Sequence, residues 1–515
     1  MKSRTIRPAN LIFFQSDNHA RQVLGCYGHA IVRTPHLDRI AFNGVRFADA
    51  YCASPLCCPA RAAIATGRYP HQTGFWDNAI AYDGSVPSWM HRLREQGHTV
   101  VAIGKLHFRS SADDNGFTQE IVPMHLHEGR GAVKNLLRGY DAEPRCENGS
   151  RWDLYAARSG EGSTHYQDYD CTVTARAIEW LRSHARASNK PWILLVSYAC
   201  PHPPFTVPRR LLDLYPERDM PLPVRFRPGE RPGHPALEFL RATDGMQEMT
   251  DEAMLRRVAA AYFGLITFMD EQVGAVLKAA EELGLLRTTR IAYTSDHGEL
   301  FGAQGLFGKK NLYEGAVGVP LLLAGPSVPC GRVVRQFVSH VDLFPTLIES
   351  AGARPAPEDR TLPGISLWPA VRGGEAARLA FAEYHAQGSR AGAFMLREGK
   401  LKLVYHVGMP PQLFDLEADP DETRDLIADA ESVTVAGDPA EAARRLERRL
   451  RAILDPEDAD RRAKADQRAK VESWGGVDEV AQADQILFTP PPGVSKEEAW
   501  ALGERPAGSG GAVTG

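Results

Sequence analysis

The chain has 515 residues, of which 43% are hydrophobic and 24% charged, close to the average mixture of a folded globular protein. This length is enough for a large core and predicts two domains. A formal net charge of −4 argues against a protein held to nucleic acid or to a membrane surface by bulk electrostatics, so we expect binding at a local site.

The N-terminal segment contains an apolar run at residues 11–14, which is too short for the core of a signal peptide. Nowhere does an uncharged stretch approach the roughly 18 apolar residues of a membrane-spanning helix. We therefore expect a cytoplasmic protein without membrane contact. The eight cysteines show no repeated CxxC pairs, which argues against a zinc site and a disulfide framework.

Apolar runs of strand length recur between amphipathic stretches. They lie at residues 10–16, 98–103, 192–198, 290–295 and 319–324. One long helix is indicated by a single stripe of apolar residues in steps of three and four, from Leu255 to Val276. This alternation predicts an α/β protein with a mainly parallel central sheet covered by helices on both faces.

In such sheets the ligand binds beyond the carboxyl ends of the strands. Four residues of metal-binding or catalytic type follow the predicted strands, namely Asp17, Lys105, His202 and Asp296. The edge of the sheet that they share is therefore the predicted site.

The segment 201–235 contains ten prolines, too many for a long helix or a strand of the central sheet. We predict a long ordered loop that is suited to covering the site. Short strand-like pieces and charged helical sequence follow after about residue 375. We predict a catalytic domain at 1–375, a smaller α+β domain at 376–500 and a disordered Gly-rich tail at 501–515.

An adjacent cysteine pair begins the most informative motif. Pro59 suits the first turn of a helix and Gly67 suits its end, which places Cys57 at a helix N-terminus. Unpaired amides there, together with Arg61 one turn later, favour a tetrahedral anion.

The pattern Cys57-x-Pro59-x-Arg61, followed by Thr66-Gly67-Arg68, resembles the signature of the sulfatase family, in which the cysteine is oxidised to formylglycine. Cys58 lacks Pro and Arg at the required spacing and is predicted to be a small buried side chain that only packs in the core. Further segments resemble the family around Lys105, Asp296, Lys309 and Asp342. The resemblance covers roughly residues 9–425 and implies the alkaline-phosphatase-like α/β sandwich with a small C-terminal domain.

The resemblance also implies a metal site. Asp17, Asp296 and His297 would bind one divalent ion together with an oxygen of the formylglycine derived from Cys57. Oxygen ligands such as carboxylates suit Ca²⁺, which is the favoured ion, or Mg²⁺. The imidazole ligand makes Mn²⁺ a further candidate. Asn18 stands where many family members have a second aspartate.

Catalytic roles are implied for Arg61, Lys105 and Lys309, which would hold the anionic ester, and for the histidines His107 and His202. The implied nucleophile is a hydroxyl of the hydrated aldehyde, with His202 or Lys309 as general acid and His107 as the base that regenerates the aldehyde. Asn78 resembles a contact to a substrate oxygen. Glu383 is predicted either to pair with a cationic leaving group, as in choline sulfatases, or to be a surface glutamate.

The predicted function is therefore hydrolysis of a sulfate ester. Phosphonate monoesters and phosphodiesters remain alternatives, because the site charge suits any tetrahedral monoanion. A remote alternative is a noncatalytic metal-binding member of the fold. The implied partners are a formylglycine-generating enzyme, a small anionic ester and further copies of the chain in a homo-oligomer.

Overall fold

The computed structural model describes residues 6–140, 158–186, 190–246, 250–429, 438–483, 489–495 and 498. The predicted tail at 501–515 lies outside these residues. Within the described ranges, no helix combines the length and the apolar character needed to cross a membrane.

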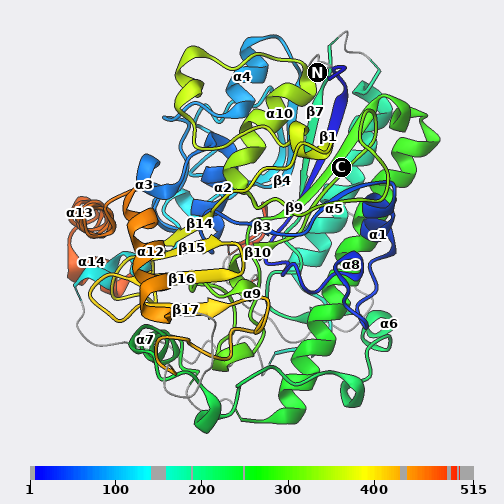
Figure 1. Cartoon of the computed structure of the whole chain (residues 1–515). Coiled ribbons are helices and arrows are strands. Elements are labelled where there is room, and N and C mark those ends of the chain that lie inside the picture. Colours follow the sequence, from blue (N-terminus) through cyan, green and yellow to red (C-terminus); the bar gives the residue numbers. More distant parts are fainter. Residues whose placement is uncertain are drawn as a thin grey trace.

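An eight-stranded sheet forms the centre of the molecule (Figure 1). Its strands, in spatial order, are β12 (Arg332–Val334), β2 (Gly44–Phe47), β11 (Leu321–Ala324), β9 (Thr289–Ser295), β1 (Asn10–Ser16), β7 (Ile193–Ser197), β4 (Val100–Lys105) and β5 (Gln119–Met124). The five strands from β9 to β5 are parallel, and only β11 runs antiparallel to both of its neighbours. The predicted mainly parallel sheet is confirmed.

Two of the predicted strands differ in detail. The run at 98–103 becomes β4 at 100–105, so that Lys105 ends the strand instead of following it. The run at 319–324 is divided between β11 and the short β10 (Gly318–Val319). β10 pairs with β3 (Ala50–Tyr51), which also pairs with β13 (Val338–Ser339).

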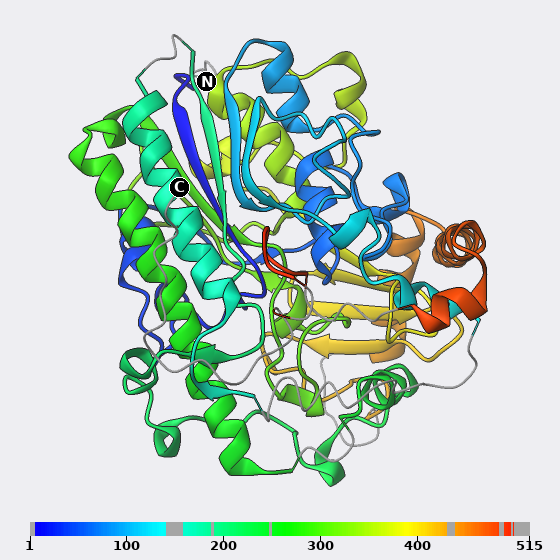
Figure 2. The same ribbon diagram turned by 180° about the vertical axis from the view of Figure 1, so that it is seen from behind.

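Helices cover both faces of the sheet, as Figures 1 and 2 show. One face carries α1 (Pro35–Phe42), α5 (His165–His184) and α8 (Glu252–Glu282), and the other carries α2 (Cys57–Thr66), α4 (Trp89–Glu95) and α10 (Leu343–Ala351). The predicted apolar stripe lies on α8, where Leu255 and Val276 are both buried. Asp251 begins this helix by accepting hydrogen bonds from the amides of Ala253 and Met254.

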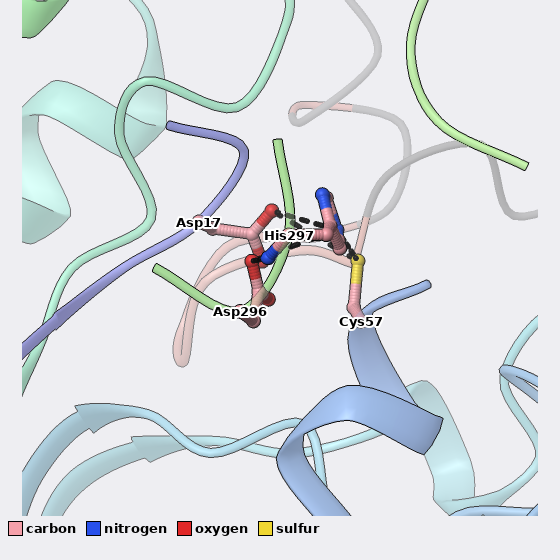
Figure 3. Close-up of side chains that lie close together, drawn as sticks. All are labelled: Asp17, Cys57, Asp296 and His297. Carbon is pink, nitrogen blue, oxygen red and sulfur yellow. Dashed lines mark hydrogen bonds and ion pairs between the residues drawn. The ribbon is translucent and has the colours of Figure 1, made fainter. Parts of the chain in front are cut away.

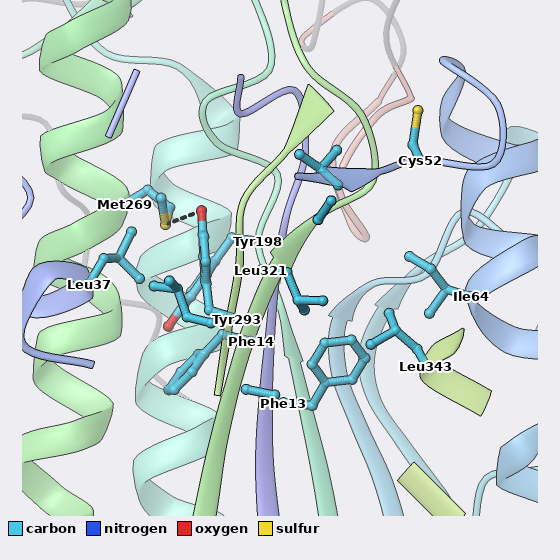
Figure 4. Packing of buried hydrophobic residues seen from close by; sticks show 14 of the residues in the cluster. Phe13, Phe14, Leu37, Cys52, Ile64, Tyr198, Met269, Tyr293, Leu321 and Leu343 are labelled. Atoms are coloured by element: carbon cyan, nitrogen blue, oxygen red, sulfur yellow. Dashed lines mark hydrogen bonds between the residues drawn. The ribbon is translucent and has the colours of Figure 1, made fainter. Parts of the chain in front are cut away.

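The core lies where these helices meet the sheet (Figure 4). Phe13 and Phe14 are neighbours on β1 and point to opposite faces, so that one strand contributes to the packing on both sides. Each fully buried side chain of this size contributes about 1.5–3 kcal/mol. Continuous burial on both faces explains why apolar residues follow one another in β1 without alternating with polar ones.

The Pro-rich segment packs largely along α8. It contributes β8 (Thr206–Val207), which pairs with β6 (Gly160–Glu161), and α6 (Arg209–Leu212), and it ends where α7 (Pro235–Thr243) begins. It forms no long helix and no strand of the central sheet, as predicted.

A separate four-stranded antiparallel sheet follows in the C-terminal part of the chain. Its strands are β14 (Ala380–Tyr384), β15 (Ala393–Glu398), β16 (Leu401–His406) and β17 (Gln412–Asp415). α12 (Pro439–Arg451) packs against β15 and β16, whereas α13 (Pro456–Ser473) and α14 (Val477–Gln482) pack on the 3₁₀ segment Val133–Gly139. The smaller α+β unit is thus confirmed. The remaining short helices are α3 (Pro70–Thr73), α9 (Glu314–Val317) and α11 (Trp368–Val371).

Candidate active site

The predicted metal ligands converge at the carboxyl ends of two neighbouring strands (Figure 3). Ser16 of β1 is paired with Ser295 of β9, so the next residues, Asp17 and Asp296, emerge side by side. His297 follows directly, and Cys57 is the first residue of α2. One donor atom from each of Asp17, Cys57, Asp296 and His297 lies within 4.8 Å of the others, and all four residues are buried.

Cys57 faces the cluster from the helix N-terminus. Its Sγ lies 3.2 Å from His297 Nε2 and 3.9 Å from Asp17 Oδ1. Burial and the neighbouring Asp17 carboxylate raise the pKa of the Cys57 thiol to about 11. The unmodified thiol is therefore uncharged at neutral pH and is a poor nucleophile. Gly67 ends α2 in the left-handed conformation, as its position in the motif predicts.

Arg61 joins the two carboxylates. Its Nε donates to Asp296 Oδ2 at 2.8 Å and its Nη2 donates to Asp17 Oδ2 at 3.2 Å. The Nη1 group donates to the carbonyl of Lys105 at 2.6 Å and to Ser197 Oγ at 3.1 Å. With its donors divided among four partners, the guanidinium is held in one orientation next to Cys57.

Lys105 and Lys309 bring two further positive charges. Lys105 Nζ lies 2.8 Å from Asp17 Oδ2, and Lys309 Nζ donates to Asn18 Oδ1 at 3.4 Å. Asn18 has φ of 74°, and its Nδ2 donates to Glu299 Oε2 at 2.7 Å. Glu299 thus fixes the amide so that its oxygen points toward Lys309.

The charges around the carboxylates act in opposite directions. Burial raises the pKa of Asp17, but the charges of Lys105 and Arg61 outweigh it and hold this pKa well below its usual value. Burial and the Asp17 charge raise the pKa of Asp296. Such a pair of carboxylates stays ionised together when a divalent cation lies between them.

His297 has the tautomer and the charge state that a metal ligand needs. Its Nδ1 lies 3.0 Å from the carbonyl of Gly298, which can only accept, so Nδ1 carries the proton and Nε2 presents its lone pair to the cluster. Burial and the charge of Lys309 keep the pKa of His297 well below its usual value. The imidazole is therefore neutral, as a ligand must be.

The donor set fits a hard divalent cation. Two carboxylates and one neutral imidazole are present, and an oxygen in place of the Cys57 sulfur would complete a site for Ca²⁺, Mg²⁺ or Mn²⁺.

His107 and His202 lie next to the cluster. Burial, followed by the charges of Lys105 and Arg61, lowers the pKa of His107 well below its usual value. Burial and Lys309 do the same for His202, whose Nδ1 donates to the Pro203 carbonyl at 2.8 Å. Both imidazoles are therefore neutral.

The predicted substrate contacts lie in different surroundings. Asn78 Oδ1 accepts from the amide of Cys58 at 3.0 Å, directly beside Cys57. Glu383 is fully buried, which excludes the surface glutamate considered above. Its Oε1 accepts from His71 Nδ1 at 2.8 Å and its Oε2 from His385 Nε2 at 2.9 Å. Glu383 is not part of the metal cluster.

The sequence did not identify several residues of the site. Glu299 could have been found, since it lies three residues after Asp296 in a segment that resembles the sulfatase family. Thr489, whose Oγ1 lies 2.7 Å from His107 Nε2, and Tyr166 carried no signal, because a threonine before three prolines and a tyrosine in α5 have no distinctive spacing. Tyr166 lies with its ring centre 5.6 Å from Lys105 Nζ and 5.8 Å from the His202 ring.

Fold and site define an α/β protein with a buried candidate metal centre and three cations arranged for an anion. Residues 9–353 match the family model Sulfatase, and residues 302–449 match the model N-sulphoglucosamine sulphohydrolase, C-terminal. The chain belongs to the sulfatase family and is a sulfuric ester hydrolase.

The chain is 33% identical over 411 residues to the choline-sulfatase of Rhizobium meliloti (strain 1021), covering 77% of this chain and 78% of the relative. It is 26% identical over 478 residues to arylsulfatase K of Xenopus laevis, covering 87% and 82% of the two chains. The structure of the phosphonate monoester hydrolase of Agrobacterium radiobacter superposes on this chain with a TM-score of 0.68 at 24% sequence identity. The superposition covers 86% of this chain and 95% of the hydrolase. The alkaline-phosphatase-like fold is thereby confirmed.

Proposed function

We propose that the chain hydrolyses a sulfate ester of a small alcohol, using a formylglycine derived from Cys57 and one divalent metal ion, with Ca²⁺ as the favoured ion. The observation that carries this proposal is the convergence of Asp17, Cys57, Asp296 and His297 on one point beside Arg61. The converted residue would supply a nucleophilic hydroxyl, and the metal would polarise the oxygens of the ester group.

The cationic and imidazole side chains of the site then have separate roles in the reaction. Lys105 and Arg61 hold the carboxylates and add positive charge where the transferring group gathers negative charge. Lys309 protonates the leaving oxygen, since neutral His202 has no proton on its Nε2 to give. Neutral His107 accepts a proton in the second half of the reaction.

Substrate recognition is proposed to use Asn78 and Glu383. Asn78 is supported by its hydrogen bond to the amide at the start of α2, which places its side chain beside the ester group. Glu383 would favour an ester of a cationic alcohol such as choline, and one relative of this chain is a choline-sulfatase. His71, whose ring is partly exposed, lies between solvent and Glu383 and would have to yield to such a group.

A second candidate is hydrolysis of phosphonate monoesters or phosphodiesters by the same residues. Arg61, Lys105 and Lys309 suit any tetrahedral monoanion, which supports this alternative. The loss of motif residues would support a noncatalytic role, whereas every core position of the motifs carries a residue of the expected type.

The decisive experiment combines maturation with a substrate panel. The protein is produced together with a formylglycine-generating enzyme, and peptide mass spectrometry establishes the state of residue 57. Release of sulfate from choline sulfate and aryl sulfates is then compared with hydrolysis of matched phosphonate monoesters and phosphodiesters. Sulfate release that disappears in Cys57→Ala supports the proposal. A converted, metal-loaded protein that cleaves only the phosphorus esters refutes it in favour of the second candidate.

The proposal also includes a cytoplasmic location, a homo-oligomer and catalytic and C-terminal domains that meet near residue 375. Cell fractionation, light scattering after size-exclusion chromatography and limited proteolysis test these three points in turn.

A further inference from the structure

A segment from the far end of the chain enters the active site. Thr489 Oγ1 lies 2.7 Å from His107 Nε2, across 382 positions of sequence. Thr489, Pro490 and Pro491 are buried, whereas residues 492 and 493 are exposed. Figure 2 shows this red segment passing through the middle of the molecule, near the carboxyl ends of the central strands.

The hydrogen bond involves one specific nitrogen of His107. The imidazole is 6% exposed, and no hydrogen-bond partner for its Nδ1 is found among the residues that the structure describes. The backbone has φ of 57°, and its amide donates to the Met124 carbonyl at 2.8 Å. A non-glycine residue in this conformation is held by its surroundings, and such residues cluster at functional sites.

Thr489 is itself fixed from a second direction. Its carbonyl accepts from the hydroxyl of Tyr166 at 2.9 Å. The Tyr166 ring lies against Lys105 and His202. The backbone and the hydroxyl of Thr489 are thus both attached to residues around the cluster, so the position of its hydroxyl is well defined.

We propose that Thr489 is a positioning residue of the active site, which holds the His107 ring through Nε2 so that Nδ1 is the nitrogen left for the reaction. The inference rests on the proposed function, because that function gives His107 its proton-accepting role. Without the hydroxyl, the ring can rotate about its side-chain bonds, and the fraction of molecules with a correctly placed nitrogen falls. The segment also shields Nε2 from solvent.

The test compares Thr489→Val, which keeps the shape but removes the hydroxyl, with Thr489→Ser, which keeps the hydroxyl. Thr267→Val is a matched control, since this threonine of α8 is 6% exposed and its hydroxyl bonds to the Tyr215 hydroxyl, away from the cluster. In matured protein we expect T489V to lower kcat about tenfold, as for one lost hydrogen bond, with little change in KM. T489S should restore most of kcat.

A second measurement does not depend on turnover. Diethyl pyrocarbonate acylates neutral imidazole nitrogens, and peptide mass spectrometry gives its rate of reaction at His107, also in unmatured protein. We expect faster modification in T489V and wild-type rates in T489S and T267V. Equal rates at His107 in wild type and T489V, or equal kcat losses in T489V and T267V, would overturn the inference. If the matured wild type releases no sulfate, the proposed function fails, and the acylation rates still decide the role of Thr489.

Discussion

Arg61 Nε lies 2.8 Å from Asp296 Oδ2, and the same guanidinium also reaches Asp17. Arg61 is one turn after Cys57 on α2, so a single side chain connects the helix that begins at Cys57 to both carboxylates of the candidate metal site. A lysine keeps the charge but has no planar set of donors and cannot make these contacts simultaneously.

Arg61→Lys is therefore expected to lower kcat by roughly 10²–10³, the loss seen when one donor to developing charge is removed. Steady-state kinetics and metal analysis of the same samples measure the effect. Arg92→Lys is the matched control, because Arg92 is 6% exposed and binds Asp359 outside the site. Near-normal activity in R61K would show that charge alone is sufficient.

The two adjacent cysteines should behave differently. Cys57 faces His297, whereas Cys58 packs with Ala81 and Leu126. Cys57→Ala is expected to abolish activity and Cys58→Ala to leave most of it, with formylglycine found only at position 57 by mass spectrometry. Similar losses from both substitutions would contradict the assignment of the nucleophile.

Metal removal should stop turnover. Chelation followed by desalting is expected to abolish activity, and added Ca²⁺, Mn²⁺ or Mg²⁺ should restore it to an extent that identifies the preferred ion. Asp296→Asn should weaken metal retention, measured by mass spectrometry of the bound metal. Asp270→Asn is the control, since Asp270 is a buried carboxylate that accepts from the amides of His36 and Leu37. Full activity in verified metal-free protein would end the metal proposal.

Glu383 should make stability depend on pH. Burial raises its pKa, but His71 and His385 outweigh this effect and lower it from 4.5 to about 2. Because the folded pKa lies below the unfolded value, the stabilisation is present above about pH 4.5 and is lost as the pH falls toward 2. Glu383→Gln should therefore lower the free energy of unfolding by about 1–3 kcal/mol above pH 4.5 and by less below it. Urea unfolding at several pH values measures this, with the exposed Glu417→Gln as control.

The same variant tests the leaving-group proposal. If Glu383 binds a cationic alcohol, E383Q should raise KM for choline sulfate and scarcely alter a neutral aryl sulfate. Equal proportional losses for both esters would assign Glu383 to the buried histidine network alone.

Much of the fold was predictable because its causes are local. Residues 11–14 are apolar without alternation, as a strand covered on both faces requires, and the stripe from Leu255 to Val276 has the period of a helix. The extension of β4 to Lys105 was not predictable, since a lysine at a strand end becomes part of the ladder only when a neighbouring strand pairs with it.

By itself, the sequence determined the family and the types of residue at the start of α2 and at the strand ends, because these depend on order along the chain. Only the tertiary structure decided which atoms meet. The pairing of β1 with β9 brings Asp17 to Asp296, and the return of the chain brings Thr489 to His107. Neither contact has a local cause, since each joins segments hundreds of residues apart whose approach depends on how the whole core packs.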